Sequence, residues 1–137
     1  MSQATMFIKF DKFIEMFADK EYSSDYWSDV AIIRAYEMLD GFSDADWLEL
    51  LAVVDSKSDF WVLRLCETLG DPDERALVVL LKVTSRHGNR AIYVALESIR
   101  SMISLGLDVS AYADEINAAT ERARQTTGKV SLLSTFQ

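Results

Sequence analysis

The chain has very few of the residues that interrupt helices or cross-link chains. Its 137 residues include one cysteine, one proline and five glycines. The single cysteine, Cys66, excludes an internal disulfide framework. So few prolines and glycines argue against a β-sandwich, which needs many turns. This composition favours an all-α fold with short loops, and the length suits a single domain over residues 1–137.

The sequence also lacks the apolar segments that membrane insertion or secretion requires. Half of the residues are apolar, yet no apolar run approaches the length of a membrane-spanning helix. Apolar and charged residues alternate from Lys9 onward, so we expect no secretory signal at the start of the chain. We therefore expect a cytoplasmic protein that does not contact a membrane.

The negative charge is confined to the first half of the chain. Residues 1–60 contain 13 Asp and Glu against 5 Lys and Arg, whereas residues 61–137 contain 9 of each. The whole net charge of -8 therefore arises before residue 61. An acidic half repels nucleic acid and attracts a basic protein. DNA binding is disfavoured further because the sequence has no clustered Lys and Arg.

Apolar spacing and capping residues predict seven helices and no strand. Ser43 with Asp46 three residues later is typical of an N-terminal cap, and Phe42 and Trp47 occupy the positions of a hydrophobic staple. We place the helices at residues 5–19, 25–39, 44–55, 58–69, 72–86, 90–104 and 109–126, before a Ser/Thr-rich tail at 127–137.

A 30-residue repeat organises the middle of the chain. When residues 29–39, 59–69 and 89–99 are aligned, four apolar positions coincide at the spacing i, i+3, i+4, i+7, the inward stripe of one helix. The matched sets are Ile32, Val62 and Ile92; Ala35, Leu65 and Ala95; Tyr36, Cys66 and Leu96; and Leu39, Leu69 and Ile99. Opposite this stripe stand Glu37, Glu67 and Glu97, with Arg34 and Arg64 in two of the copies.

The repeat resembles a known class of sequence. The stretch Asp59-Phe-Trp-Val-Leu-Arg64, then Leu69-Gly-Asp-Pro72 and the apolar helix Ala76–Val83, is similar to the short HEAT-like repeats of the phycobilisome-lyase type. The resemblance covers residues 28–104 and implies a short α-solenoid, a right-handed stack of helix pairs whose exposed faces bind proteins. We expect repeats over residues 25–104, capped by the helices at 5–19 and 109–126, because stacked repeats need covered ends.

A broader resemblance concerns the chain as a whole. A small, acidic, helical-repeat protein with no catalytic motif is similar to the immunity proteins of bacterial toxin systems, including contact-dependent growth inhibition. This likeness implies a stoichiometric inhibitor that neutralises a toxin domain with a basic surface, such as a nuclease, by occluding it. We also consider a helical-repeat adaptor or scaffold, and thirdly a HEAT-like chromophore lyase. We expect a monomer when the protein is free.

The candidates for catalysis and metal binding favour structural roles. His87, the only histidine, stands at the predicted C-terminal end of a helix. A histidine at this position more often interacts with the helix dipole than catalyses a reaction. Cys66 occupies the inward stripe and is expected to be buried, whereas a nucleophile needs exposure and a nearby base. One His, one Cys and no calcium-loop spacing give no metal site. We therefore expect no enzyme activity and no cofactor.

The candidate partner contacts are the carboxylates of the acidic half, the three matched glutamates and two tryptophans. Asp29 and Asp59 also suit turn or capping roles, as do Asn89 and the Asp71-Pro72 pair. Trp47 suits the core, whereas Trp27 and Trp61 are expected to be contact anchors because aromatic residues dominate interface energetics. The full set is Asp11, Glu15, Asp19, Asp25, Trp27, Asp29, Glu37, Asp44, Asp46, Glu49, Asp59, Trp61, Glu67 and Glu97.

Overall fold

The computed structural model describes residues 4–18, 26–86 and 90–131, and over these ranges the chain forms helices and no strand. The predicted all-α class is thus confirmed. The α-helices are α1 (Thr5–Phe17), α3 (Ile32–Asp40), α4 (Asp44–Val53), α5 (Asp59–Thr68), α6 (Glu74–Thr84), α7 (Arg90–Ser104) and α8 (Ala113–Ser131). A π-helix, η1 (Trp27–Ala31), leads into α3, and short 3-10 helices, η2 (Val54–Ser56) and η3 (Ser110–Tyr112), follow α4 and precede α8.

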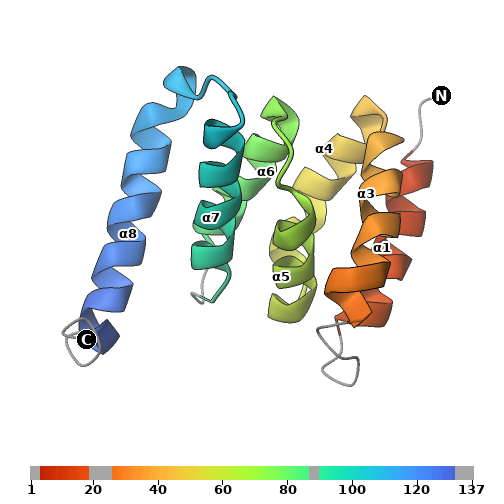
Figure 1. Cartoon of the computed structure of the whole chain (residues 1–137), viewed down its shortest axis with the longest axis horizontal. Helices are drawn as coiled ribbons and strands as arrows, with labels where there is room; N and C mark the ends of the chain where they lie inside the picture. Colours follow the sequence, from red (N-terminus) through yellow and green to blue (C-terminus); the bar gives the residue numbers. More distant parts are fainter. Residues whose placement is uncertain (1–3, 19–25, 87–89, 132–137) are drawn as a thin grey trace.

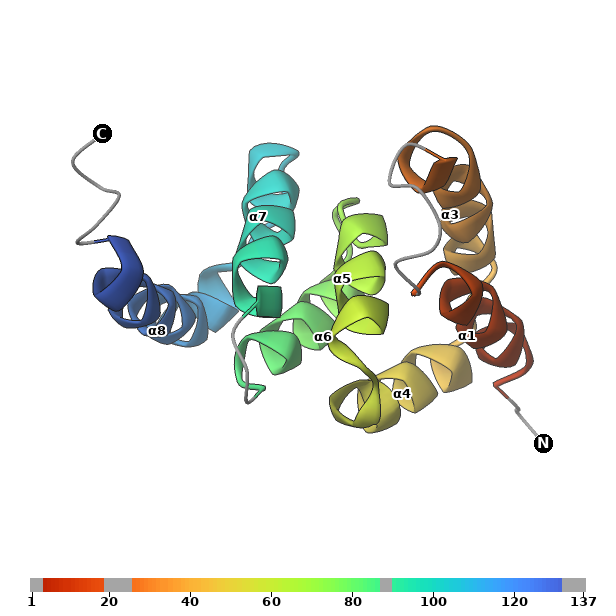
Figure 2. The same cartoon turned by 90° about the horizontal axis from the view of Figure 1, so that it is seen from below.

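The helices lie side by side in two rows. Viewed from below, α3, α5 and α7 form one row, and α4, α6 and α8 lie on its other side (Figure 2). Successive helices therefore alternate between the rows, and α8 and α1 lie at opposite ends of the molecule (Figure 1). No helix in the described part of the chain is long and apolar enough to cross a bilayer.

The predicted start of α4 is confirmed in detail. The Ser43 hydroxyl accepts a hydrogen bond from the Asp46 backbone N–H at 3.2 Å, and the Asp46 carboxylate accepts one from the Ser43 N–H at 2.8 Å. The two side chains thereby satisfy N–H groups that have no partner within the helix. The staple forms as well, because the Phe42 and Trp47 rings meet edge to face with centroids 5.1 Å apart.

Other boundaries differ from the prediction. Asp73, not Asp71, caps α6, because its carboxylate accepts hydrogen bonds from the N–H groups of Arg75 and Ala76. Ser58 caps α5 in the same way. α8 continues to Ser131 instead of ending near residue 126, so part of the predicted tail is helical.

The inward stripe of the repeat is confirmed in its second copy and in its third. All four stripe residues of α5 and of α7 are buried. In α3 only Ala35 is buried, while Tyr36 is 40% exposed. The stripe is therefore confirmed in two copies and only in part in the first, where Ile32 and Leu39 are partly buried and Tyr36 is exposed. α3 stands at the end of its row, and Tyr36 and Leu39 border a surface cleft.

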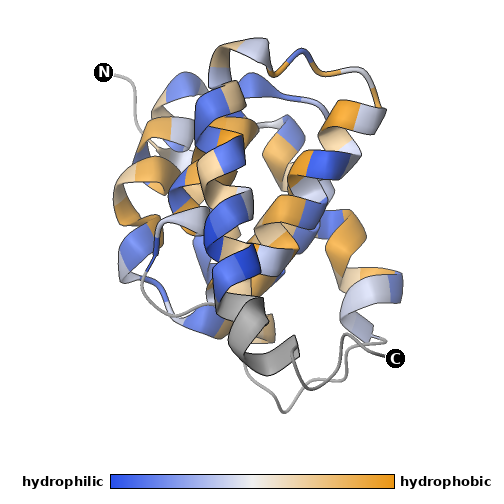
Figure 3. Cartoon of the chain, turned by 90° about the vertical axis from the view of Figure 1, so that its left-hand side faces the viewer, coloured by the Kyte–Doolittle hydropathy of each residue, from blue (hydrophilic) through white to orange (hydrophobic). Residues whose placement is uncertain are grey.

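The two terminal helices cover the core unequally. α1 buries Phe7, Phe10, Ile14 and Phe17 against the neighbouring helices. α8 buries only the small side chains Ala119 and Ala123 among its described residues. Its outward side is polar and charged, as seen for the helix nearest the viewer in Figure 3.

Candidate protein-binding face

The structure places the predicted contact residues in very different surroundings. Asp19 and Asp25 lie outside the described residues, as do His87 and Asn89. Asp11 is partly buried, and Asp46, Trp27 and Trp61 are buried. The exposed members of the predicted set are Glu15, Asp29, Glu37, Asp44, Glu49, Asp59, Glu67 and Glu97.

The prediction that Trp27 and Trp61 anchor a partner is wrong. Their side chains are 0% and 1% exposed, so neither can reach another molecule without unfolding its surroundings. Trp61 packs edge to face against Phe10, and Trp27 packs against Phe17. Tryptophans near a helix start suit an interface and a core equally well by sequence, and here α1 covers both of them.

Asp46 is also an internal group and not a contact. Its carboxylate accepts hydrogen bonds from the Ser43 N–H and, at 2.8 Å, from the N–H of Phe7 in α1. Burial alone would raise the pKa of Asp46, but these hydrogen bonds outweigh burial and hold the pKa below its ordinary value. The residue therefore fixes α1 onto the start of α4.

Basic side chains from the second half of the chain neutralise several acids of the first half. Arg75 pairs with Asp44 at 3.2 Å, and Arg86 pairs with Asp59 at 3.1 Å. Within the first half, Lys57 pairs with Asp11 at 2.8 Å. The charge asymmetry between sequence halves therefore does not become a uniformly acidic face, because folding brings the later cations onto the earlier carboxylates.

The three matched glutamates occupy equivalent, exposed positions on α3, α5 and α7. Each has an arginine of its own helix three residues away, at 3.8 Å for Glu37, 3.4 Å for Glu67 and 2.7 Å for Glu97. The partners are Arg34, Arg64 and Arg100. This row is balanced in charge and does not form a ladder of free carboxylates.

An acidic cleft lies where α3 and α5 end. It has a volume of about 70 Å³, and its walls are Tyr36, Leu39, Asp40, Trp47, Thr68, Leu69, Asp71, Asp73 and Ala76. Asp40 and Asp71 are exposed, and no ion pair holds either of them among the described residues. The C-terminal ends of two helices add partial negative charge at the same place.

Tyr36 reports the electrostatics of this cleft. Burial raises the pKa of the Tyr36 hydroxyl above its usual value, and the negative charges of Asp71 and Glu67 raise it further. Burial is the larger cause, and only the part of the rise that comes from Asp71 and Glu67 reflects negative charge near the hydroxyl. The cleft is therefore acidic, with Asp40 and Asp71 exposed in its walls.

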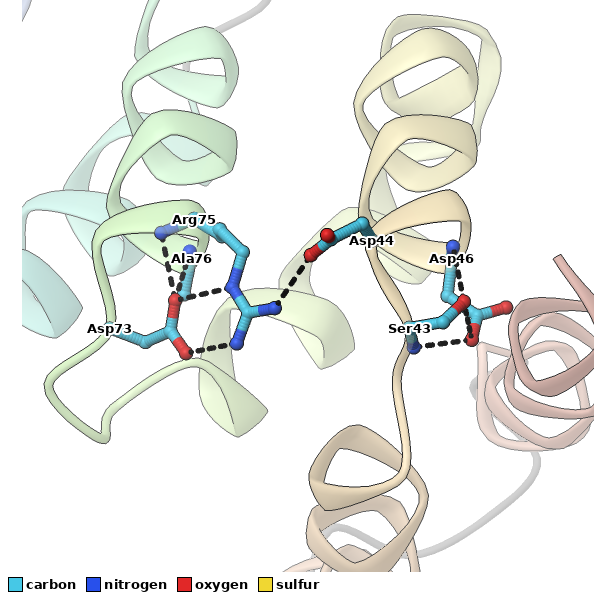
Figure 4. A network of polar contacts seen from close by, with 6 residues as sticks. All are labelled: Ser43, Asp44, Asp46, Asp73, Arg75 and Ala76. Carbon is cyan, nitrogen blue, oxygen red and sulfur yellow. Dashed lines mark hydrogen bonds and ion pairs between the residues drawn. The ribbon is translucent and has the colours of Figure 1, made fainter. Parts of the chain in front are cut away.

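Arg75 contacts two residues of the cleft wall, Asp73 and Trp47, without lining the cleft itself. Its guanidinium contacts the Asp73 carboxylate at 3.1 Å and the Asp44 carboxylate at 3.2 Å, so that it bridges the starts of α6 and α4 (Figure 4). It also lies 5.4 Å from the centroid of the Trp47 ring. Two carboxylates and an aromatic face hold this cation, so it does not neutralise Asp40 or Asp71.

An apolar groove lies on the other side of Trp47, between α4 and α6. Its volume is about 330 Å³, and its walls are Asp44, Trp47, Leu48, Leu51, Arg75, Val78 and Val79. Leu48 is 67% exposed, the largest exposed fraction among the large apolar residues that the structure describes. The cleft and the groove share the Trp47 side chain, so they form one continuous face.

The buried thiol of Cys66 does not take part in this face. Its side chain is 0% exposed, as predicted, and burial raises its pKa to about 12. A thiol in this state is neither accessible nor ionised at neutral pH. The described residues bring together no group of three His, Cys, Asp or Glu side chains that could hold a metal ion.

Sequence reasoning missed the residues that form this face. Asp40 directly follows Leu39, whereas Asp71 stands two residues after Leu69, so the two acids do not occupy matched positions of the repeat and the alignment does not single them out. Leu48 lies in an apolar helix, and the sequence alone does not show which leucines of that helix are buried and which are exposed. Comparison of the chain with protein families, with curated proteins and with solved structures finds no match.

Proposed function

We propose that this protein is a stoichiometric inhibitor of the immunity type, which binds a toxin domain with a basic surface and occludes it. The observation that carries the proposal is the acidic cleft, in which Asp40 and Asp71 are exposed and the pKa of Tyr36 is raised by burial and by nearby negative charge. The volume of the cleft, about 70 Å³, is far below the roughly 300–1,000 Å³ typical of small-molecule sites. It suits the end of a lysine or arginine side chain.

The architecture supports a binding role. We interpret the alternating rows as three stacked helix pairs of the HEAT-like kind, α3 with α4, α5 with α6 and α7 with α8, with α1 covering one end. In such stacks the turns between paired helices lie along one edge. The cleft is built from two of these turns, after α3 and after α5, so the stacking itself brings Asp40 and Asp71 together.

The mechanism is occlusion without chemistry. A basic side chain of the toxin enters the cleft and pairs with Asp40 and Asp71, while the surrounding face covers the toxin's own site. The negative potential raises the association rate, and the apolar contacts around Trp47 and Leu48 lower the dissociation rate. An adaptor protein would use the same face, but its binding would not abolish a toxic activity.

Co-expression tests this function directly. A neighbouring gene that encodes a toxin domain would supply the partner, which is produced in a sensitive host with and without this protein while growth is measured. We expect wild type to restore growth and to form a 1:1 complex. The double reversal Asp40→Lys/Asp71→Lys should slow association at low salt. The effect should shrink as the screening length falls from about 30 Å at 0.01 M to about 8 Å at 0.15 M salt.

A matched reversal elsewhere separates local charge from net charge. Asp114→Lys/Glu121→Lys changes the net charge equally but places it on α8. Equal slowing by the two double variants would mean that net charge alone matters and that the cleft has no special role. Complex formation without growth rescue would favour the adaptor over the inhibitor.

A further inference from the structure

The apolar groove between α4 and α6 has an ordered pattern of side chains. Along α4 and into η2, Asp44, Leu48, Leu51 and Asp55 recur at helical spacing, acid at both ends and leucine between. α6 faces these residues with the complementary order. It has a basic residue at each end, Arg75 and Lys82, and two valines between them, Val78 and Val79. Along the two segments the apolar residues therefore lie between two pairs of opposite charge, of which only Asp44 and Arg75 line the groove.

Two ion pairs link these segments, one in the groove wall and one beyond Leu51 and Val78, outside the lining of the groove. Arg75 pairs with Asp44 at 3.2 Å, and Lys82 pairs with Asp55 at 3.9 Å. The cations are held further by internal acceptors, Arg75 by Asp73 and Lys82 by the Leu51 carbonyl at 2.7 Å. The carboxylates are less enclosed, because the side chain of Asp44 is 92% exposed and that of Asp55 is 54% exposed.

We propose that this groove binds an amphipathic helix of the partner protein, with an apolar stripe facing Leu48, Leu51 and Val78 and a lysine or arginine at each end of that stripe. The charge pattern selects this occupant. Arg75 and Lys82 each have a second acceptor, whereas the side chains of Asp44 and Asp55, although each pairs with one of these cations, stay largely exposed on either side of the apolar residues. The inference deepens the proposed function and rests on it, because the helix belongs to the same basic partner whose side chain enters the acidic cleft.

The spacing of the two carboxylates also suits a partner helix. Asp44 and Asp55 are eleven residues apart, which at 1.5 Å per residue corresponds to roughly 17 Å or three helical turns. A partner helix along the groove would therefore carry two basic residues about eleven positions apart. Between them, apolar residues would recur every three or four positions, so that they form one stripe. Anionic lipid is disfavoured by the same carboxylates, and so is a second copy of this chain, whose net charge is -8.

A synthetic helix tests the inference without knowledge of the natural partner. The probe is a stapled helical peptide of about 18 residues, longer than the roughly 12–15 below which isolated helices are marginal. It has a leucine stripe and a lysine at each end of that stripe. A second peptide has the same stripe with glutamates in place of the lysines. We expect the lysine peptide to bind wild-type protein and the glutamate peptide to bind at least about tenfold more weakly.

Variants at Leu48 locate the binding. Because Leu48 is 67% exposed, Leu48→Glu should fold normally, which thermal unfolding by circular dichroism checks. We expect Leu48→Glu to weaken the lysine peptide by about tenfold or more, as loss of an interface anchor commonly does. Leu48→Ala should weaken it less. The control is Leu105→Glu, an equal change at a leucine that is 61% exposed in the turn before α8. This control should bind as wild type does.

Several outcomes would overturn the inference. Equal loss in Leu48→Glu and Leu105→Glu would show that the peptide responds to net charge and not to the groove. Equal binding of the two peptides would remove the role of Asp44 and Asp55. A wild-type dimer in sedimentation that Leu48→Glu converts to a monomer would assign the groove to a second copy. None of these results bears on growth rescue or on the Asp40→Lys/Asp71→Lys variant, so the groove can fail while the proposed function stands.

Discussion

The Arg64 guanidinium lies over the indole ring of Trp27, 5.1 Å from its centroid, and its Nε donates a hydrogen bond to the Phe17 carbonyl at 2.9 Å. One side chain of α5 therefore holds the end of α1 and the π-helix before α3. Its side chain is only 13% exposed, although sequence places it on the outward side of the repeat. The long aliphatic stem allows an arginine that starts at the surface to reach an internal acceptor.

Removal of this contact should destabilise the fold. We expect Arg64→Ala to lower the free energy of unfolding by about 2 kcal/mol, within the range for hydrogen bonds of charged groups. Chemical denaturation measures the change. Arg34→Ala is the control, because Arg34 holds the equivalent place one repeat earlier and its side chain is 65% exposed. Its loss should cost about 0.5 kcal/mol or less. A similar cost at both sites would contradict the bridging role of Arg64.

The inward stripe of α5 gives a second comparison of stabilities. Leu65→Ala and Leu69→Ala should each cost roughly 2–5 kcal/mol, because both side chains are buried and truncation leaves a cavity. Glu67→Ala on the same helix should cost about 0.5 kcal/mol or less, as exposed substitutions usually do. Urea titration of the three variants measures these changes in the free energy of unfolding. A larger cost at Glu67 would mean that the stripe is assigned to the wrong side.

Asp46 should make stability depend on pH in the acid range. A carboxyl whose folded pKa is lowered stabilises the fold above its unfolded pKa, near 3.8, and this contribution is lost as pH falls through the folded value. Asp46→Ala should cost about 2–3 kcal/mol at neutral pH, because the Ser43 N–H and the buried Phe7 N–H both lose their acceptor. Its stability should fall less steeply than that of wild type below pH 4. Asp44→Ala, an exposed neighbour, should cost less than about 1 kcal/mol.

The Cys66 thiol should not react with thiol reagents in the native protein. Burial raises its pKa from 9.0 to about 12, so a thiol reagent at pH 8 should react only as fast as the protein unfolds. The thiol also makes the stability of the fold depend on pH, because the folded state binds the thiol proton more tightly than the unfolded state does. Stability from this group is present below pH 9 and declines as pH rises toward 12. Cys66→Ala should flatten that decline. Rapid labelling of the native protein would contradict the burial.

The electrostatics of the acidic cleft can be measured at Tyr36. Asp71→Asn should lower the pKa of Tyr36 toward its ordinary value of 10.0, because one of the two charges that raise it is removed. Nuclear magnetic resonance of the Tyr36 ring during alkaline titration measures the shift. Asp114→Asn on α8 removes one charge away from the cleft and should leave the Tyr36 pKa unchanged. Equal shifts in both variants would show that Tyr36 responds only to net charge.

Much of the fold could be predicted because local chemistry determines it. The cap at Ser43, the staple of Phe42 and Trp47, and the buried stripes of α5 and α7 all follow from residues close together in sequence. The candidate face could not be predicted in this way. Asp40 and Asp71 meet only when two turns stack, and Arg75, 31 positions after Asp44, takes up that carboxylate only in the folded chain. Charges summed along a sequence do not anticipate such pairing.

Trp47 forms a wall of the acidic cleft and also a wall of the apolar groove. Because protein interiors are close-packed, a ligand that displaces this indole from one side also alters the wall of the other. The two sites are then thermodynamically linked, and occupancy of either changes the affinity of the other by the same factor in both directions. Binding energies measured with isolated fragments of a partner, one for each site, will therefore not add up to the binding energy of the intact partner.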